Sequence, residues 1–447
     1  MNSIQSLRIR KVIAIGMLLT LLCEVAPVSN CSAATEEYTL TYSNESNQSL
    51  KESELLQEFQ EHSNQVKQMK ENYSLKNIQA QIAEQTKNQA GIRTGAISGS
   101  ISTYNQMKTE LENIICALQT EYEAYLKSED YEELTALQYC NAIQDYQSQL
   151  ITVNQQISSL NESYASANTQ YHSYVLEADL EQFYITNREL CEQEEIKTLM
   201  YDFYDNVLSL IVLKEQGKYY DNYQSYLKIQ EKAEKIKLRN GLSTMLDVSE
   251  IQAMITATDS ERDEIETSYQ SVFTSIYDEI GQENINIAVA LNDSKNSFSS
   301  TKIIETILKE NITYLQLKNT ITVYQDYLFT GDIAGTLQHQ QITELISSYE
   351  TQKVMLEKSI QRYVESMIRT YDQAVMKLHA IANSGNVLKQ QYQVVKEQYN
   401  HGRATILNVT SMECKLYENK VNYYQTMAKK MRIEYILEHE IYGITIN

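Results

Sequence analysis

The sequence predicts an all-α protein, elongated and built from duplicated long helical hairpins, with little or no β-structure. Three observations predict this fold class. Apolar residues recur at helical spacing over stretches of tens of residues. The 447 residues include one proline, Pro27, and 12 glycines. A proline removes a backbone donor and clashes with the preceding turn, so a chain nearly free of proline can form long helices. The third observation is an internal repeat.

The repeat is clearest around two glycines. The sequence LKIQEKAEKIKLRNG ends at Gly241, and LKQQYQVVKEQYNHG ends at Gly402, which lies 161 positions later. After each glycine the same pattern follows, with Thr244, Leu246 and Val248 matching Thr405, Leu407 and Val409. The helical pattern after each turn then closes at a glycine, Gly281 or Gly443. Self-similarity at a fixed offset predicts a duplicated structural unit.

Taken in order, the chain begins with a secretory signal. Arg8, Arg10 and Lys11 precede the apolar run Val12–Leu22, and the small residues Ser32-Ala33-Ala34 follow. This order predicts a signal peptide over 1–34 and export of the protein. Residues 35–50 are polar and are expected to form a flexible lead.

The first helical repeat is predicted over 51–281. A helix is expected from Lys51 to about Lys87, and the glycine-dense stretch from Gly91 to Ser100 is expected to break it. An inserted helical pair at about 104–159, turning near Ser128, is expected next. A long helix then leads to Gly241.

The second helical repeat is predicted over 282–447. A polar connector from Asn284 to Ser300 is followed by a helix from Lys302 to about Leu328. The stretch Phe329–Gly335 predicts a short break. Helix is then expected from about Leu337 to Asn400, and again from Gly402 to Gly443.

Composition and motifs argue against several functions. The formal net charge of −21 disfavours a nucleic-acid partner, since phosphate binding depends on clustered Lys and Arg. The six histidines are scattered without ligand spacing, and no phosphate loop or nucleophile elbow occurs. The sequence therefore nominates no catalytic, cofactor-binding or metal-binding residues, and we expect a protein that is not an enzyme.

Cys116 and Cys140 lie at equal distances from the turn expected near Ser128. Residues equidistant from a turn can face each other in an antiparallel helical pair, and an exported chain can keep a disulfide. We therefore predict a Cys116–Cys140 disulfide. The alternative is that both are small hydrophobic side chains that pack in the hairpin.

The repeat residues resemble the TolC family of trimeric efflux-channel proteins. The stronger copy is Tyr399-x-x-Gly402-x-x-Thr405, continuing to Val409 and closing at Gly443; the weaker copy runs from Gly241 to Gly281. The resemblance spans about 51–443. It implies a homotrimer that forms a hollow helical tube. It also implies that hairpin tips dock to a membrane-fusion adaptor protein, which works with an inner-membrane transporter of the ABC or a similar class.

The resemblance also implies which residues form the hairpin tips. In the first copy they are Gly241, Thr244, Asp247 and Val248. In the second they are Tyr399, Gly402, Thr405, Asn408 and Val409. The family often places acidic residues just past the glycine to constrict the pore. Asp247 keeps one, but Asn408 stands at the matching place, so a cation-selective constriction is not expected.

The resemblance implies an outer-membrane location, yet neither break is long enough for the pair of membrane-spanning strands that the family inserts there. We therefore expect a relative without these strands, in the cell envelope, at the cell surface or secreted. The leading hypothesis is a non-catalytic conduit of an efflux or export system. The alternative is a secreted or surface coiled-coil structural or adhesion protein without a transport role.

Overall fold

The computed structural model describes residues 36–41, 49–128, 132–281, 286–291, 295–330 and 336–445. The predicted signal peptide, residues 1–34, lies outside them, as does most of the predicted break at 329–335. The described chain is helical apart from three short strands and the connecting segments, which confirms the all-α class.

The helices of the first half are α2 (Glu52–His62), α3 (Asn64–Tyr125), α4 (Glu133–Thr186), α5 (Arg188–Arg239) and α6 (Met245–Ile280). Those of the second half are α7 (Ser300–Glu310), α8 (Ile312–Thr330), α9 (Leu337–Asn400) and α10 (Ile406–Glu438). The bounds of α9 agree with the predicted helix.

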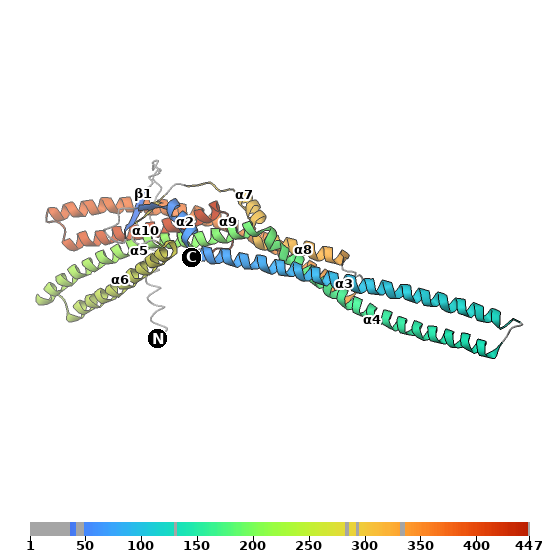
Figure 1. The fold of residues 1–447 in the computed structure, drawn as a ribbon. Helices are drawn as coiled ribbons and strands as arrows, with labels where there is room; N and C mark the ends of the chain where they lie inside the picture. The colour runs from blue at the N-terminus through green and yellow to red at the C-terminus, as the bar shows by residue number, and fades with distance from the viewer. Residues whose placement is uncertain are drawn as a thin grey trace.

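Four of these helices form a layer in the order α6, α5, α10, α9, in which each packs against the next. The turn between α5 and α6 and the turn between α9 and α10 lie at the same end of the molecule, on the left of Figure 1. The turn between α3 and α4 lies at the opposite end. The two glycine turns of the repeat are thus neighbouring tips of two parallel hairpins.

The second half of α10 is the centre of the hydrophobic core. From Tyr424 to Leu437 nearly every side chain is buried, because α9 and α5 lie on either side of the helix and α7 shares a cluster with it. The stretch also buries charge, since Lys430 and Glu434 form an ion pair at 2.9 Å within it. The core therefore lies in the body, where the elements converge, away from the tips.

A small sheet adds the β-structure. Strands β1 (Glu36–Thr41) and β2 (Ser49–Lys51) pair with either side of β3 (Asn286–Leu291), antiparallel and parallel respectively. The expected flexible lead, residues 35–50, thus forms strands in part, and the connector supplies the central one. The physical reason is that Ile287, Val289 and Leu291 alternate and are buried on the helical body.

The predicted break in the glycine-dense stretch is wrong, because α3 runs through it without interruption. Gly91 faces the ring of Tyr171 on α4, and a Cβ there would lie 3.2 Å from a ring carbon. Thr94 is buried one turn further along, and its hydroxyl bonds the carbonyl of Ala90. Packing against α4 outweighs the cost of about 1 kcal/mol per helical glycine.

The outer parts of α3 and α4 pack against each other as an antiparallel pair. Less exposed residues recur along α3 at alternating steps of three and four, for example Ile101, Tyr104, Lys108 and Leu111. This spacing gives a single seam between two helices. The predicted inserted pair at about 104–159 is therefore the outer part of one longer hairpin, whose turn does follow Leu126 as expected near Ser128.

Candidate functional site

The first tip is a glycine-dependent reversal. Gly241 has φ of +71°, and its N–H bonds the carbonyl of Leu238 at 3.0 Å. The next N–H, of Leu242, bonds the carbonyl of Lys237 at 2.9 Å. A left-handed residue after a helix with these bonds satisfies carbonyls that would otherwise lack partners. Glycine adopts that conformation without steric cost.

The second tip repeats this geometry. Gly402 has φ of +69°, and its N–H bonds the carbonyl of Tyr399 at 2.9 Å. The next N–H, of Arg403, bonds the carbonyl of Gln398 at 2.7 Å. Both predicted reversals are therefore confirmed as turns, and the duplication extends to individual backbone bonds.

A capping box begins the helix that follows each turn. The hydroxyl of Thr244 accepts a bond from the backbone N–H of Asp247, whose carboxylate accepts one from the N–H of Thr244 at 2.8 Å. Thr405 and Asn408 make the same reciprocal pair, with the Thr405 N–H 2.9 Å from the Asn408 amide oxygen. Each box satisfies two backbone donors at a helix start.

This geometry explains why an aspartate and an asparagine occupy matching positions. Both side chains supply one oxygen to the threonine N–H, and this task does not require a charge. The Asp247 carboxylate also accepts bonds from the hydroxyls of Thr244 and Ser243. The Thr244 hydroxyl, with these other donors, lowers the pKa of Asp247, which is fully exposed.

The predicted valines and the neighbouring aliphatic residues have opposite environments. Val248 and Val409 are buried, and each lies in the first turn of the helix that follows its tip. Leu242 and Leu246 are 77% and 76% exposed, and Met245 is 66% exposed. The second tip exposes Ile406 and Tyr399.

The structure thus brings the predicted residues together in two groups: Gly241, Thr244, Asp247 and Val248 at one tip, and Tyr399, Gly402, Thr405, Asn408 and Val409 at the other. The exposed leucines and the nearby arginines Arg239 and Arg403 were not predicted. Leu246 matches Leu407 in the repeat, but Leu242 falls opposite Arg403 and Arg239 falls opposite Asn400, so the repeat does not point to these three. The sequence feature that could have identified them is an apolar or cationic residue directly beside a predicted glycine turn.

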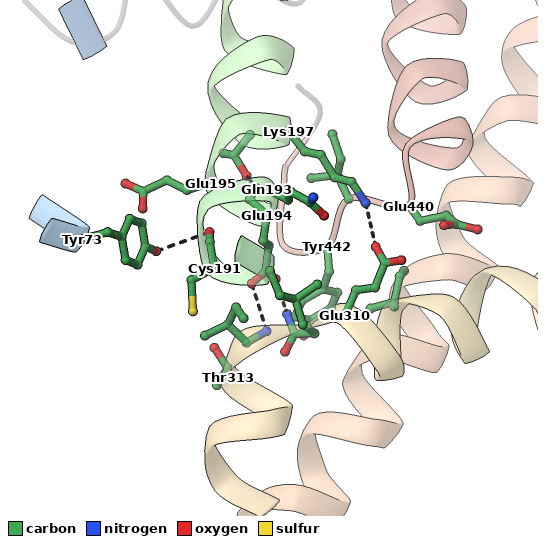
Figure 2. Close-up of a pocket in the computed structure, with 16 residues that line it drawn as sticks. Tyr73, Cys191, Gln193, Glu194, Glu195, Lys197, Glu310, Thr313, Glu440 and Tyr442 are labelled. Carbon is green, nitrogen blue, oxygen red and sulfur yellow. Dashed lines mark hydrogen bonds and ion pairs between the residues drawn. The ribbon is translucent and has the colours of Figure 1, made fainter. Parts of the chain in front are cut away.

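A polar cavity of about 320 Å³ lies where the start of α5 meets the junction of α7 and α8 (Figure 2). The Glu194 carboxylate accepts bonds from the Asn311 side chain at 2.8 Å and the Ile312 N–H at 2.9 Å. Burial raises the pKa of Glu194. Lys197 pairs with Glu310 at 2.7 Å. These groups bond one another across the joint and hold the start of α8 in place.

The predicted Cys116–Cys140 disulfide is not formed, and both residues are exposed free thiols. The register of α3 against α4 explains this. Tyr139 packs against Tyr122 and Tyr125, with ring centroids 6.0 and 5.8 Å apart. Because the helices are antiparallel, Cys140 on α4 lies level with residue 121 of α3 or a later one. Cys116 is at least five residues away from that level, an offset of about 7.5 Å along the helix.

Two further searches cover only the residues that the structure describes. None of their helices is both long and apolar enough to cross a membrane. None of their His, Cys, Asp and Glu side chains form a group of three or more that could hold a metal ion.

The sequence matches no protein-family model and no curated protein. Solved structures with a similar fold include a membrane protein from Pseudomonas aeruginosa, at 9% identity and a TM-score of 0.42 over 62% of this chain and 74% of that one. CusC is similar at 10% identity and a TM-score of 0.42, over 61% and 74% of the two chains. The outer membrane protein VceC from Vibrio cholerae is similar at 13% identity and a TM-score of 0.41, over 62% and 76%. Values this low describe a likeness of fold and transfer no function.

Proposed function

We propose that this chain is a TolC-like, non-catalytic component of an efflux or export system. Three copies form a helical conduit in the cell envelope, and the paired tips dock to a membrane-fusion adaptor that joins the conduit to an inner-membrane transporter. Residues 51–281 and 282–447 are the two repeats of each protomer. The chain itself performs no chemistry, and the transporter supplies the energy.

One observation carries this proposal. Two hairpins of the same design turn at the same end of the molecule and present exposed aliphatic side chains there, while the valines beneath them are buried. Leu242 and Leu246 contribute little to the folded chain, because most of their surface is in water. Exposed apolar side chains on two neighbouring tips are typical of a contact surface for another protein.

The tip role is tested by a bulky substitution. Gly402→Leu forces a branched side chain into a left-handed backbone, so the turn must change while the helices on either side remain. We expect co-purification with a membrane-fusion adaptor co-expressed from the same organism to be lost, with helical content by circular dichroism nearly unchanged. Gly217→Leu, on α5 away from the tip, is the control. Unchanged adaptor association in Gly402→Leu contradicts the tip role.

Assembly is tested by mass in solution. A conduit requires about three times the chain mass of 51.6 kDa, and negative-stain images should show a central channel. The alternative is a secreted or surface coiled-coil structural protein, which the long hairpin of α3 and α4 favours, since it extends away from the body in Figure 1. A monomer or a dimeric rod supports that alternative and contradicts the conduit.

A further inference from the structure

A cationic groove of about 660 Å³ crosses α10 between α5 and α9. Because α5 belongs to the first half of the chain and the other two helices to the second, the groove joins the two halves. Three cations line it, Lys377 on α9 and Lys429 and Arg432 on α10. None of its eleven lining residues, all of which the structure describes, is Asp or Glu. The whole chain has a net charge of −21, so the lining departs from the overall charge of the molecule.

The two lysines of the cationic groove have no local carboxylate partner. Within the part of the chain that the structure describes, neither Lys377 nor Lys429 has a carboxylate oxygen within 4.0 Å. The neighbouring Lys430 differs, because it pairs with Glu434 at 2.9 Å. The acid closest in sequence to Lys377 on α9 is already paired, since Asp372 lies 2.7 Å from Lys295. Two positive charges therefore line the groove without a matching negative charge.

The third cation, Arg432, is held in place by α5. Its Nε–H donates to the Asp205 carboxylate, and its Nη2 donates to the Ser209 hydroxyl at 2.9 Å. These bonds use two of the five N–H donors of the guanidinium. The charge of Arg432 is thus matched by Asp205, while its other donors stay fixed at the wall of the groove. Donors that are already ordered lose less entropy when a ligand binds.

A buried hydroxyl also lines the groove. Thr426 is only 5% exposed, yet within the described residues its hydroxyl makes no hydrogen bond. On the same helix, Thr410 donates to the carbonyl of Ile406 at 3.1 Å, which is the usual bond of a helical threonine. A buried polar group without a partner is costly, so such a group at the wall of a groove indicates a ligand that would bond it.

We propose that the cationic groove binds a dianionic phosphate group, such as that of a phosphate monoester. A phosphate monoester carries a charge of about −1.5 to −2 at pH 7, which matches the two unpaired lysines. Its oxygens accept bonds from Lys377, Lys429 and the Thr426 hydroxyl, with the free donors of Arg432 beside them. A volume of 660 Å³ is in the range of small-molecule pockets, about 300–1,000 Å³, so the groove has room for an organic body as well.

The charges in the groove favour a dianion over other anions. A single carboxylate carries one negative charge, so it would leave one of the two lysines unmatched. A nucleic acid repeats its phosphates along a backbone and is bound by many cations, whereas this groove has two that lack a partner. The inference does not rest on the proposed conduit, because all the lining residues belong to one chain.

The test uses the full mature chain and glycerol 3-phosphate, a small phosphate monoester. We expect saturable binding by calorimetry that weakens when salt is raised from about 50 to about 300 mM, because charges in an open groove are screened. The melting temperature should rise with the ligand, since a ligand that binds only the folded chain stabilises it. Glycerol, which lacks the phosphate, should not bind. Dimethyl phosphate, a diester with one charge, should bind about tenfold or more weakly.

Matched variants separate the groove from general charge. Lys377→Gln with Lys429→Gln should bind about tenfold or more weakly, and the same two positions changed to Arg should bind within about threefold of the wild type. The control, Lys358→Gln with Lys415→Gln, removes the same charge from exposed positions of α9 and α10 outside the groove and should bind normally. Thr426→Val should bind about threefold or more weakly, while the free chain should not melt lower, because the hydroxyl has no bond to lose.

Further probes identify the source of the phosphate. Inorganic phosphate that binds as tightly as glycerol 3-phosphate assigns the groove to the free ion, and tighter binding of glycerol 3-phosphate assigns it to a soluble ester. Vesicles of about 70% phosphatidylcholine and 30% phosphatidic acid, bound through the same two lysines, assign it to a lipid headgroup. The proposal is overturned if none of these phosphates binds, if dimethyl phosphate binds equally well, if the double glutamine variant or Thr426→Val binds like the wild type, or if the control variant loses as much affinity.

Discussion

The side chains of Thr244 and Asp247 each bond the other's backbone N–H, and Thr405 and Asn408 do the same 161 positions later. This relationship predicts that Asp247→Asn keeps the capping box, whereas Asp247→Ala loses it. In thermal melts at neutral pH we expect Asp247→Asn to melt slightly below the wild type, because it keeps the oxygen but not the charge, and Asp247→Ala to melt lower still. Equal melting of all three proteins would contradict a capping role.

The same pair predicts a pH dependence. The folded-state pKa of Asp247 is lowered by the Thr244 hydroxyl and the other donors, so its stabilising contribution is present above its ordinary pKa of about 3.9. That contribution is lost as the pH falls through the lower folded value. We expect the advantage of the wild type over Asp247→Ala, measured as a difference in melting temperature, to narrow below about pH 4 to the size shown by the uncharged Asp247→Asn.

Glycine at the tips predicts opposite effects of alanine at two sites. Gly402→Ala places a Cβ in a left-handed conformation and should cost about 1 kcal/mol or more. Gly217→Ala lies within α5 with no atom within 4 Å of the new Cβ, and it should stabilise by up to about 1 kcal/mol. Urea unfolding followed by circular dichroism measures both. A stabilising Gly402→Ala would mean that the turn is not left-handed.

The continuity of α3 predicts the effect of alanine at Gly95 and Gly99. Both lie in the helix, and a Cβ at either would meet no atom within 4 Å. Each change to alanine should therefore raise stability by about 1 kcal/mol. Gly95→Pro, in contrast, should cost about 3 kcal/mol and shift the melting of the hairpin. If alanine has no effect and proline is tolerated, the helix is interrupted there.

The four described cysteines should divide into two classes of reactivity. Cys116 and Cys140 are exposed, whereas Cys191 and Cys414 are buried. Burial raises the pKa of Cys414 to about 11, so little thiolate forms at pH 8. A colourimetric thiol reagent should modify Cys116 and Cys140 in the native mature chain and all four in denaturant. If Cys116 and Cys140 react slowly, and prior treatment with a reductant makes them react fast, the two residues form a disulfide.

Much of the fold follows from local sequence. The bounds of α9 and the reversals at Gly241 and Gly402 were predictable, because a residue next to a helix that needs a positive φ is almost always glycine. The predicted break of the helix at Gly91–Ser100 was wrong, because glycine also occurs within a helix where a neighbouring helix packs closely against it. Local sequence does not distinguish these two uses of glycine.

The sequence by itself determined the helical class, the duplication and the position of both tips, because helical periodicity and left-handed turns are encoded within a few residues of where they occur. Only the tertiary structure decided that both tips lie at the same end of the molecule, that α3 is continuous, and that Cys140 does not face Cys116. Each of these depends on the register and packing of segments far apart in the chain. That register is fixed by the whole set of side chains in each interface and not by any one of them.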